Sequence, residues 1–395
     1  MYKSCVLCIR LGLWALIGLL VGMMPGAAHA QNGPLSGPAG LVNPSFECTN
    51  GYYAATNSDG VEVFVPNGWQ MAEIMGAPVV ASARIFFAGS CEGSAHVERI
   101  DGIDSIVVRA KDIETPPDPG KPFDVAFYQQ TDVMTGTAYS LSSWMLSLCG
   151  GSAVPSDCPE EQYIAKMAGI DPTGGTDPLA DTVVWAENRD NFVDQNDARV
   201  GWSNVRLGVV AQGAKVTVFA RVNSPSQHHG NHAFIDVLSL VKAPTAQLTI
   251  SGTQVLSGTT LLPNTFQVRG SSAKLQWAGE LGSDIEAIEG GSHQLLFDIQ
   301  VRQQGTNSWS DLLVDVVGAG CHLYEAPGVN VNYEFRIRPR AEQLSAGVFP
   351  NQRYPGVWSE PVTIQFREAP SGVGLPLGDN LFFLPITNRP GAQGC

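Results

Sequence analysis

The stretch FDVAFYQQTDVMTGTAYSLSSWM, residues 123–145, decides the fold class of this chain. In it, two runs of alternating apolar and polar residues flank the turn sequence Thr135-Gly136-Thr137. Alternation with a period of two, rich in β-branched and aromatic residues, is typical of half-buried antiparallel strands. The apolar side of each run is predicted to be core: Phe123, Val125, Phe127 and Val133 in the first run, and Tyr139, Leu141 and Met145 in the second.

The length of the turn decides which residues lie opposite each other if the two runs form a hairpin. Directly opposed residues in a hairpin share a face, so the two apolar sets must match across the turn. A three-residue loop over 135–137 places Val133 opposite Tyr139, whereas a two-residue loop would mix the faces. A three-residue loop needs a residue with positive φ, and Gly136 can supply it. We therefore expect a hairpin with a three-residue loop.

Residues 1–30 are predicted to be a secretory signal peptide. Lys3 and Arg10 form a short basic region, an apolar run covers 11–24, and Ala28-His29-Ala30 is typical of a cleavage site. The apolar run is too short to span a membrane. We expect the mature chain to be soluble and secreted, and to remain extracellular or associated with the cell surface.

Composition and charge narrow the class of protein further. The chain has 395 residues and a net charge of −14, and an acidic surface repels phosphate backbones, so nucleic acid is not an expected partner. Its 43 glycines and 26 prolines accompany an absence of long helical patterns in the sequence. We therefore expect an all-β protein of two domains.

Six cysteines follow the predicted signal peptide, namely Cys48, Cys91, Cys149, Cys158, Cys321 and Cys395. Export permits disulfides, and six cysteines allow fifteen complete pairings. We pair Cys149 with Cys158, which flank a short Gly/Pro/Ser loop, and Cys48 with Cys91 as the simplest remaining pair. The last two cysteines have no local partner and either pair with each other or stay free.

Residues 41–243, which follow a Gly/Pro/Ala leader over 31–40, are predicted to form the first domain. This segment contains many short runs of strand-forming residues separated by turn signals. Such spacing is typical of a sandwich of two β-sheets. At this length the segment is predicted to be one domain.

Several motifs of this segment resemble the jelly roll of carbohydrate-binding modules, in the galactose-binding-like family. They are Asn43-Pro44-Ser45-Phe46-Glu47, Pro66-Asn67-Gly68-Trp69, Gln129-Gln130, Tyr139-Ser140-Leu141 and Phe234-Ile235-Asp236. The segment GIDPTGG, residues 169–175, is similar to a variant of this module in exported bacterial proteins. The inserted loops 111–121 and 149–162 depart from the family pattern, so we expect the binding surface to be reshaped.

A sugar site is predicted on the polar face of the expected hairpin. In the three-residue register, Tyr128 lies opposite Trp144, with Gln130 nearby. Pyranose rings stack on aromatic rings while amides bind hydroxyls, so these three residues are the expected ligand-binding set. The alternative is that a loop covers this face and the rings are core.

The resemblance also implies one structural calcium ion beneath the first and last strands of the jelly roll. Glu47 and Asp236 stand at the matching places, with backbone carbonyls over 93–95 as expected helpers. Calcium takes six to eight oxygen ligands, mostly carboxylates and carbonyls. The alternative is that both residues are ordinary surface carboxylates at strand ends.

Residues 244–367 are predicted to form a second β-sandwich. In the run VNYEFRIRPRA, residues 331–341, Tyr333, Phe335 and Ile337 alternate with charged residues. With Trp277 and Trp358-Ser359-Glu360-Pro361, this segment resembles a fibronectin type III domain. The resemblance implies a spacer or a binding surface, because such a fold does not fix a function.

The tail, residues 368–395, has a Pro/Gly linker followed by the apolar run LFFLPITNR over 381–389. That run is too short to span a membrane. We expect it to be either a sorting or anchoring tag for the cell envelope, or an extra strand that docks on the second domain.

The sequence contains no Gly-x-Ser-x-Gly, Walker or His-Glu-x-x-His motif, so we expect no enzyme. The expected function is that of a secreted, non-catalytic carbohydrate-binding protein with a fibronectin-like spacer and a polysaccharide or glycan partner. The alternative is a structural or adhesive protein of the cell surface without a sugar site. The two differ in whether Tyr128 and Trp144 face solvent.

Overall fold

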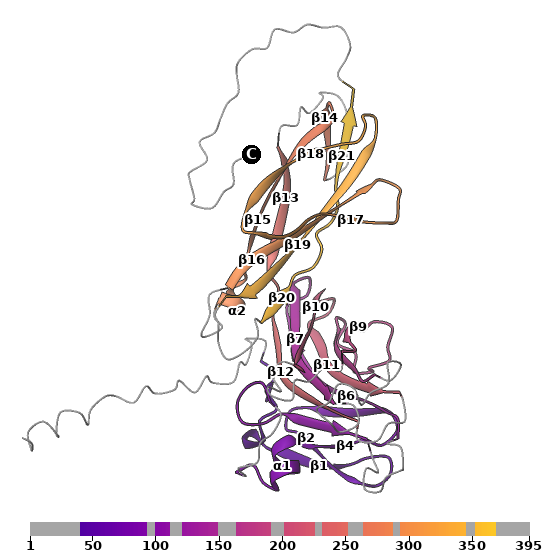
Figure 1. Ribbon diagram of the computed structural model, residues 1–395, viewed down its shortest axis with the longest axis vertical. Coiled ribbons are helices and arrows are strands. Elements are labelled where there is room, and N and C mark those ends of the chain that lie inside the picture. The colour runs from indigo at the N-terminus through magenta and orange to yellow at the C-terminus, as the bar shows by residue number, and fades with distance from the viewer. Residues whose placement is uncertain are drawn as a thin grey trace, which may run out of the picture. The chain divides into compact units, whose positions relative to one another are not determined.

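The computed structural model describes residues 40–92, 99–110, 121–148, 163–190, 201–225, 231–251, 264–286, 293–344 and 352–368 (Figure 1). Their regular secondary structure is almost all β-strand, so the predicted all-β fold class is confirmed. Their helices are the 3-10 helix Cys48–Asn50 and the short α1 (Ala83–Ala88) and α2 (Ser283–Glu286). Within these ranges, no helix is both long and apolar enough to cross a membrane.

Ten strands between β3 and β12 form two five-stranded antiparallel sheets. The β6 sheet has the order β3-β6-β11-β8-β9, and the β7 sheet has the order β10-β7-β12-β5-β4. The β6 sheet comprises β3 (Gln70–Met75), β6 (Phe123–Asp132), β8 (Ala165–Asp171), β9 (Val184–Asn188) and β11 (Lys215–Ser224). The β7 sheet comprises β4 (Val79–Ser82), β5 (Ile106–Arg109), β7 (Ala138–Leu148), β10 (Ser203–Val210) and β12 (His232–Lys242).

Apolar side chains from both sheets fill one core, so the sheets form a sandwich, which we term the first sandwich. Phe127 of β6 and Leu141 of β7 are both fully buried in this core. The other residues of the predicted core set are also buried, except Val133, which is half-buried against the core. The predicted core side of both runs is therefore confirmed.

The predicted hairpin is wrong, because β6 and β7 belong to different sheets. The turn at Gly136, with a φ of 78°, carries the chain from one sheet to the facing one. The Gly136 amide donates to the Ala211 carbonyl at 2.8 Å, and the Ala211 amide donates to the Thr137 carbonyl at 2.9 Å. An apolar side on two consecutive runs suits both a hairpin and two facing strands, so alternation alone could not distinguish them.

A two-stranded ribbon, β1 (Tyr52–Thr56) and β2 (Glu62–Pro66), packs on the first sandwich through buried valines of β2. The predicted disulfide between Cys48 and Cys91 is present, with Cα atoms 5.8 Å apart. Cys321 is disulfide-bonded as well. The predicted pair of Cys149 and Cys158 lies outside the described residues, as does the last cysteine.

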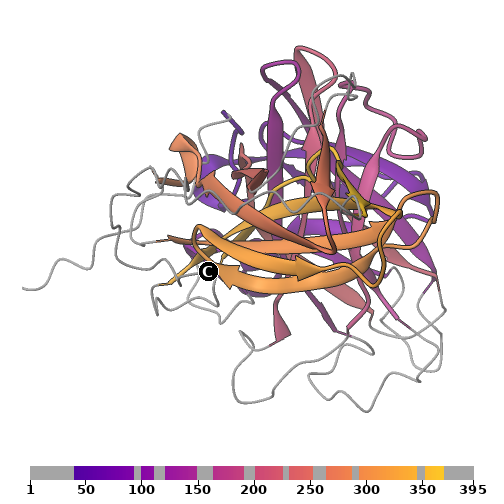
Figure 2. The same cartoon turned by 90° about the horizontal axis from the view of Figure 1, so that it is seen from above.

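Strands from β13 onward form a second sandwich, whose colours run from rose at β13 through orange to yellow at β21 in Figure 2. Its smaller sheet has the order β13-β15-β18. Its larger one, the β19 sheet, has the order β14-β21-β19-β16-β17, with β20 paired to β19. The strands are β13 (Thr245–Ser251), β14 (Thr265–Arg269), β15 (Ser272–Glu280), β16 (His293–Gln303), β17 (Ser310–Val317), β18 (Gly320–Glu325), β19 (Asn332–Gln343), β20 (Arg353–Pro355) and β21 (Val362–Arg367).

The core of the second sandwich joins its two sheets. Trp277 of β15 is 5% exposed and packs with Phe297 of β16 and Ile337 of β19. Along β19, Phe335 and Ile337 are buried while Arg336 is half-buried on the outer side, as the alternation predicted. The resemblance to a fibronectin type III domain stays a prediction.

On the outer face of the β19 sheet, arginine and tryptophan side chains alternate in a stack. The Arg336 guanidinium carbon lies 4.3 Å from the ring centroid of Trp309 and 4.4 Å from that of Trp358. Arg302 also lies over Trp309, at 4.4 Å, and Arg338 over Trp358, at 4.7 Å. These cation–π contacts hold the segments before β17 and before β21 against β16 and β19.

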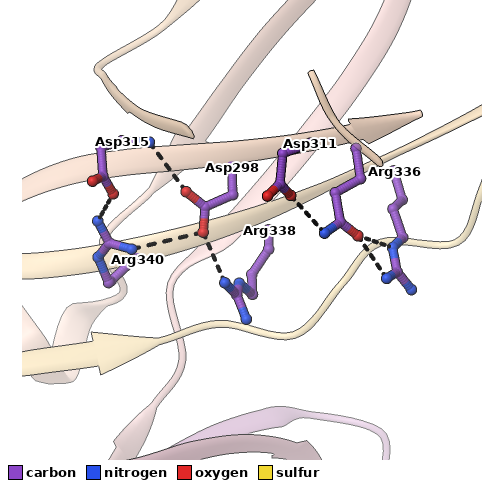
Figure 3. A network of polar contacts seen from close by, with 7 residues as sticks. Asp298, Asp311, Asp315, Arg336, Arg338 and Arg340 are labelled. Atoms are coloured by element: carbon purple, nitrogen blue, oxygen red, sulfur yellow. Dashed lines mark hydrogen bonds and ion pairs between the residues drawn. The ribbon is translucent and has the colours of Figure 1, made fainter. Parts of the chain in front are cut away.

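Carboxylates and an amide fix the guanidinium groups of this stack (Figure 3). Arg336 donates to the Gln300 carbonyl oxygen at 2.9 and 2.6 Å. Asp298 accepts a hydrogen bond from Arg338 at 2.8 Å and forms an ion pair with Arg340 at 3.7 Å. The same network includes Asp311 and Asp315. These ion pairs and hydrogen bonds thereby order the polar outer face.

We predict that Arg336→Ala lowers the free energy of unfolding by about 2 kcal/mol, because two ring contacts of the stack are lost. Arg269→Ala is the matched control, since Arg269 is exposed and its side chain forms no ion pair or hydrogen bond with the described residues. Thermal melting of both variants measures the effect. Equal melting temperatures would show that the stack adds nothing to stability.

Candidate functional site

Three aromatic side chains form a row across the outer face of the β6 sheet. The register pairs Phe219 of β11 with Tyr128 of β6 and with Gly169 of β8, and pairs Gly169 with Trp185 of β9. The ring centroids of Tyr128 and Phe219 are 5.8 Å apart, and those of Phe219 and Trp185 are 5.6 Å apart. Phe219 is fully buried, whereas Tyr128 and Trp185 are half-buried. The row therefore presents two partly exposed rings on a shared apolar base.

A glycine allows the row to close. A Cβ atom on Gly169 would lie 2.5 Å from the Trp185 ring, which is far inside van der Waals contact. Glycine in the interior of a strand is typical of such a close approach. The indole of Trp185 therefore lies against the backbone of β8, where it contacts Phe219.

Amide side chains flank the β6 side of this row. The Tyr128 hydroxyl donates to the Gln70 carbonyl oxygen at 2.6 Å, across the β3–β6 pair. The Gln130 amide donates to the Gly174 carbonyl at 2.7 Å. Gln70 and Gln130 are exposed. Each amide has two donor hydrogens and two acceptor lone pairs, so both keep capacity for a ligand.

A bidentate ion pair lies beside the aromatic row. Arg221 of β11 donates from Nε and Nη2 to the two carboxylate oxygens of Asp124 of β6, at 2.8 and 2.5 Å. The same guanidinium lies 5.5 Å from the Trp185 ring centroid. The side chains of Arg221 and Asp124 are 12% and 5% exposed. The pair is therefore fixed and adds no net charge to the face.

The turn after β8 is held by a buried carboxylate. Burial raises the pKa of Asp171, but the hydroxyls of Thr173 and Thr182, which donate at 2.6 and 2.8 Å, outweigh this and lower that pKa below its usual value. Asp171 therefore stays ionised and fixes the turn whose Gly174 carbonyl receives Gln130.

The expectation that Trp144 shares a face with Tyr128 and Gln130 is wrong. Trp144 lies on β7, on the outer face of the other sheet, and is 4% exposed. Its Nε1 donates to the Gln352 carbonyl oxygen at 2.5 Å, so its polar atom is also occupied. Because β6 and β7 lie in facing sheets, their outward side chains point to opposite sides of the sandwich. Tyr128 and Gln130 do share a face.

Sequence analysis did not identify Trp185, Arg221 or Asp124 as members of this face. Trp185 ends an apolar run, and nothing in that run shows which strand it pairs with. The useful signal is Gly169, a lone glycine in a strand beside a tryptophan. The glycine indicates a close approach of Trp185 only once the register of β8 and β9 is known.

The predicted calcium ligands Glu47 and Asp236 both bind the turn 100–103. Asp236 accepts two backbone amides of this turn at 2.8 and 3.0 Å, and Glu47 accepts one at 3.1 Å. Both side chains are buried. The carbonyls over 93–95 that were expected to help lie outside the described residues.

The carboxyl groups around this turn have perturbed pKa values. Burial raises the pKa of Glu47 to about 7 against the opposing Ile103 amide, and the charges of Asp104 and Asp101 add to the rise. Burial also raises the pKa of Asp236 well above its usual value. No basic side chain of the described residues forms an ion pair with Glu47 or Asp236. Among all the residues that the structure describes, no group of three or more His, Cys, Asp or Glu side chains is arranged to hold a metal ion.

Comparisons with known proteins give distant likenesses. No protein-family model and no curated protein matches the chain. One similar solved structure is TmCBM61 in complex with beta-1,4-galactotriose, 14% identical over 51% of this chain and 97% of that one, with a TM-score of 0.31. A family 16 carbohydrate binding module is 12% identical over 36% and 80%, with a TM-score of 0.22. A cleaved adhesin domain of Lys-gingipain from Porphyromonas gingivalis is 13% identical over 48% and 99%, with a TM-score of 0.29.

We predict that Glu47→Gln removes a pH-dependent loss of stability. The pKa of Glu47 is about 7 in the fold against an ordinary 4.5, so the folded chain binds this proton more tightly than the unfolded chain. That contribution to stability is fully present below pH 4.5 and is lost as the pH rises through 7. The natural chain should therefore lose up to about 3 kcal/mol of unfolding free energy between pH 5 and pH 8 that the variant does not lose.

Denaturant unfolding at pH 5 and pH 8, with chelator present, measures this difference. Glu62→Gln is the matched control, because Glu62 is exposed on β2. If both variants follow the pH dependence of the natural chain, Glu47 is not the titrating group.

Proposed function

We propose that this chain is a secreted, non-catalytic protein that binds polysaccharide on the outer face of the β6 sheet. The observation that carries the proposal is the row of Tyr128, Phe219 and Trp185, with two half-buried rings on a buried base. The C–H faces of pyranose rings pack on aromatic rings, and amides such as those of Gln70 and Gln130 bind hydroxyls.

The length of the row favours a run of sugar rings over a single ring. From β6 to β9 the face crosses β11 and β8, so it spans three strand spacings, or about 14 Å. Tyr128 and Trp185 stand near its two ends, with Gln130 beside Tyr128. A glycan laid across the strands would contact both rings and reach this amide.

Charge favours a neutral glycan. Asp124 neutralises Arg221, so the positive charge next to Trp185 is not free to attract an acidic sugar. The whole chain carries a net charge of −14, which repels polyanions.

The carboxylates near the row support a non-catalytic role. Glycoside hydrolysis uses two carboxyl groups that are free to act as acid and as base or nucleophile. Asp124 is held by Arg221, Asp171 is held ionised by two threonines, and Glu187 is paired with Arg189. Each of these carboxylates already has a structural partner.

Two further parts of the proposal concern the rest of the chain. The signal-peptide pattern of residues 1–30 supports export, and the apolar run of 381–389 is the segment we assign to attachment at the cell envelope. The resemblance of 244–367 to a fibronectin type III domain supports a spacer role for the second sandwich.

We predict that Trp185→Ala weakens glycan binding about tenfold or more, because one of the two partly exposed rings is lost. Gly169→Ala should act in the same direction, since its Cβ would displace the Trp185 ring. Val184→Ala is the matched control, because Val184 is 45% exposed on the same strand with the opposite orientation. Affinity electrophoresis and calorimetry against neutral and acidic polysaccharides measure binding.

Unchanged binding by folded Trp185→Ala and Gly169→Ala chains would exclude this face as the site. If the natural chain binds no polysaccharide of the panel, an adhesive or structural role without a sugar site becomes the better account.

We also propose that Glu47 and Asp236 bind one structural calcium ion. The observation behind this is that both side chains are buried without an ion-pair partner among the described residues. Hard oxygen donors of this kind suit calcium, which takes six to eight of them. Carbonyl oxygens would have to complete the shell. The ion would neutralise the buried charges and thereby stabilise the fold.

We predict that calcium raises the melting temperature of the chain more at pH 8 than at pH 5, because Glu47 must lose its proton to bind the ion. Chelator should reverse the rise, and Glu47→Gln should reduce it while Glu62→Gln leaves it unchanged. Scanning calorimetry with and without calcium measures this. A melting temperature that does not respond to calcium at either pH would contradict the proposal.

A further inference from the structure

A polar pocket of about 360 Å³ lies in the second sandwich. It is formed where the end of β16, the start of β19 and the end of β21 meet. Its lining residues are Gln303, Gln304, Asn330, Val331, Asn332 and Arg367. Five of these six side chains are amides or a guanidinium, and none is a carboxylate. The volume is at the lower end of the range for small-molecule sites.

Hydrogen bonds hold the polar groups of the pocket in place. Asn332 donates its amide hydrogen to the Gln304 side-chain carbonyl at 2.8 Å, and it accepts from Arg367 Nη1 at 3.1 Å. Arg367 Nη2 donates to the Gln365 side-chain carbonyl at 3.0 Å. The Gln304 backbone amide also donates to the Asn332 carbonyl at 2.9 Å. Groups fixed in this way lose little freedom when a ligand binds.

Part of the hydrogen-bonding capacity of the pocket is left over. Gln303 is exposed, and its side chain forms no hydrogen bond with the described residues. The side-chain nitrogen of Gln304 and the Nε of Arg367 likewise form no hydrogen bond with the described residues. An amide both donates and accepts, so the pocket offers both kinds of group to a ligand.

The charge around the pocket is balanced. Arg367 is the charged lining residue, and Asn330 donates to Glu368 at 3.2 Å, which places a carboxylate at the rim. An acidic ligand would meet the repulsion of Glu368. Hydroxyl groups, which both donate and accept and carry no charge, match this arrangement better than a carboxylate does. The lining contains no aromatic ring, so binding would rest on hydrogen bonds and be weak.

We propose that this pocket binds a single neutral sugar ring. The second sandwich would then contact glycan itself in addition to acting as a spacer. The pocket shares no residue with the row of Tyr128, Phe219 and Trp185, so this inference does not depend on the site proposed for the first sandwich.

The test uses the full chain with Trp185→Ala, which weakens the first site, and saturation-transfer NMR with glucose, galactose, mannose and glucuronate at millimolar concentration. We expect transfer to at least one neutral sugar. Adding Gln303→Ala should weaken that binding about threefold to tenfold, as expected for a lost hydrogen bond. This substitution removes a side chain without a hydrogen-bond partner among the described residues, so it should leave the fold intact. Gln247→Ala is the matched control, because Gln247 is an exposed glutamine of β13 in the other sheet.

Arg367→Lys is a second test variant and should also weaken the transfer, because lysine keeps the charge but loses the planar guanidinium that donates to two side-chain amides. Absence of transfer to every neutral sugar overturns the inference. Transfer that persists at full strength in both Gln303→Ala and Arg367→Lys also overturns it, and transfer to glucuronate alone rules out the neutral class. Failure of the site proposed for the first sandwich is a separate outcome, because it would appear as unchanged polysaccharide binding by the Trp185→Ala chain.

Discussion

The packing of the apolar side of β6 against that of β7 is the constraint on which the first sandwich depends. Because Phe127 and Leu141 meet in one core, the alternate residues of the two strands must point outward on opposite sides. Tyr128 thereby reaches the face that carries Phe219 and Trp185. Trp144 reaches the other outer face, where it is buried. The same alternation thus leaves the outward ring of β6 half-exposed and the outward ring of β7 buried.

The two sandwiches use outward aromatic residues in contrasting ways. In the second sandwich, Arg336 lies between the rings of Trp309 and Trp358, so guanidinium groups occupy those ring faces. In the first, the guanidinium of Arg221 is held by Asp124 at the side of the row, and the rings of Tyr128 and Trp185 stay half-exposed. In the second sandwich the ring faces are therefore used to stabilise a sheet, whereas in the first sandwich part of the aromatic surface stays exposed.

Features that depend on residues close together in the sequence could be predicted, whereas features that depend on pairing between distant strands could not. The core sides of β6 and β7 depend on local alternation, and they were predicted correctly. The pairing of β6 with β11, and the face built on it, depends on strands far apart in the chain. Asp124, Gly169, Trp185 and Arg221 come from four strands, and no local pattern brings them together. The amide pocket likewise joins three distant segments.

The crossing of the chain at Gly136 also affects how the first sandwich can form. β6 pairs with β3, which precedes it, but its other neighbour β11 and both neighbours of β7, β10 and β12, come later in the chain. Folds dominated by such distant pairings form slowly, because long loops must close before contacts are gained. During synthesis, the sheets on either side of this core therefore stay incomplete until nearly all strands of this sandwich have emerged. A chain that ends before β12 (His232–Lys242) would present the apolar sides of β6 and β7 to aggregation.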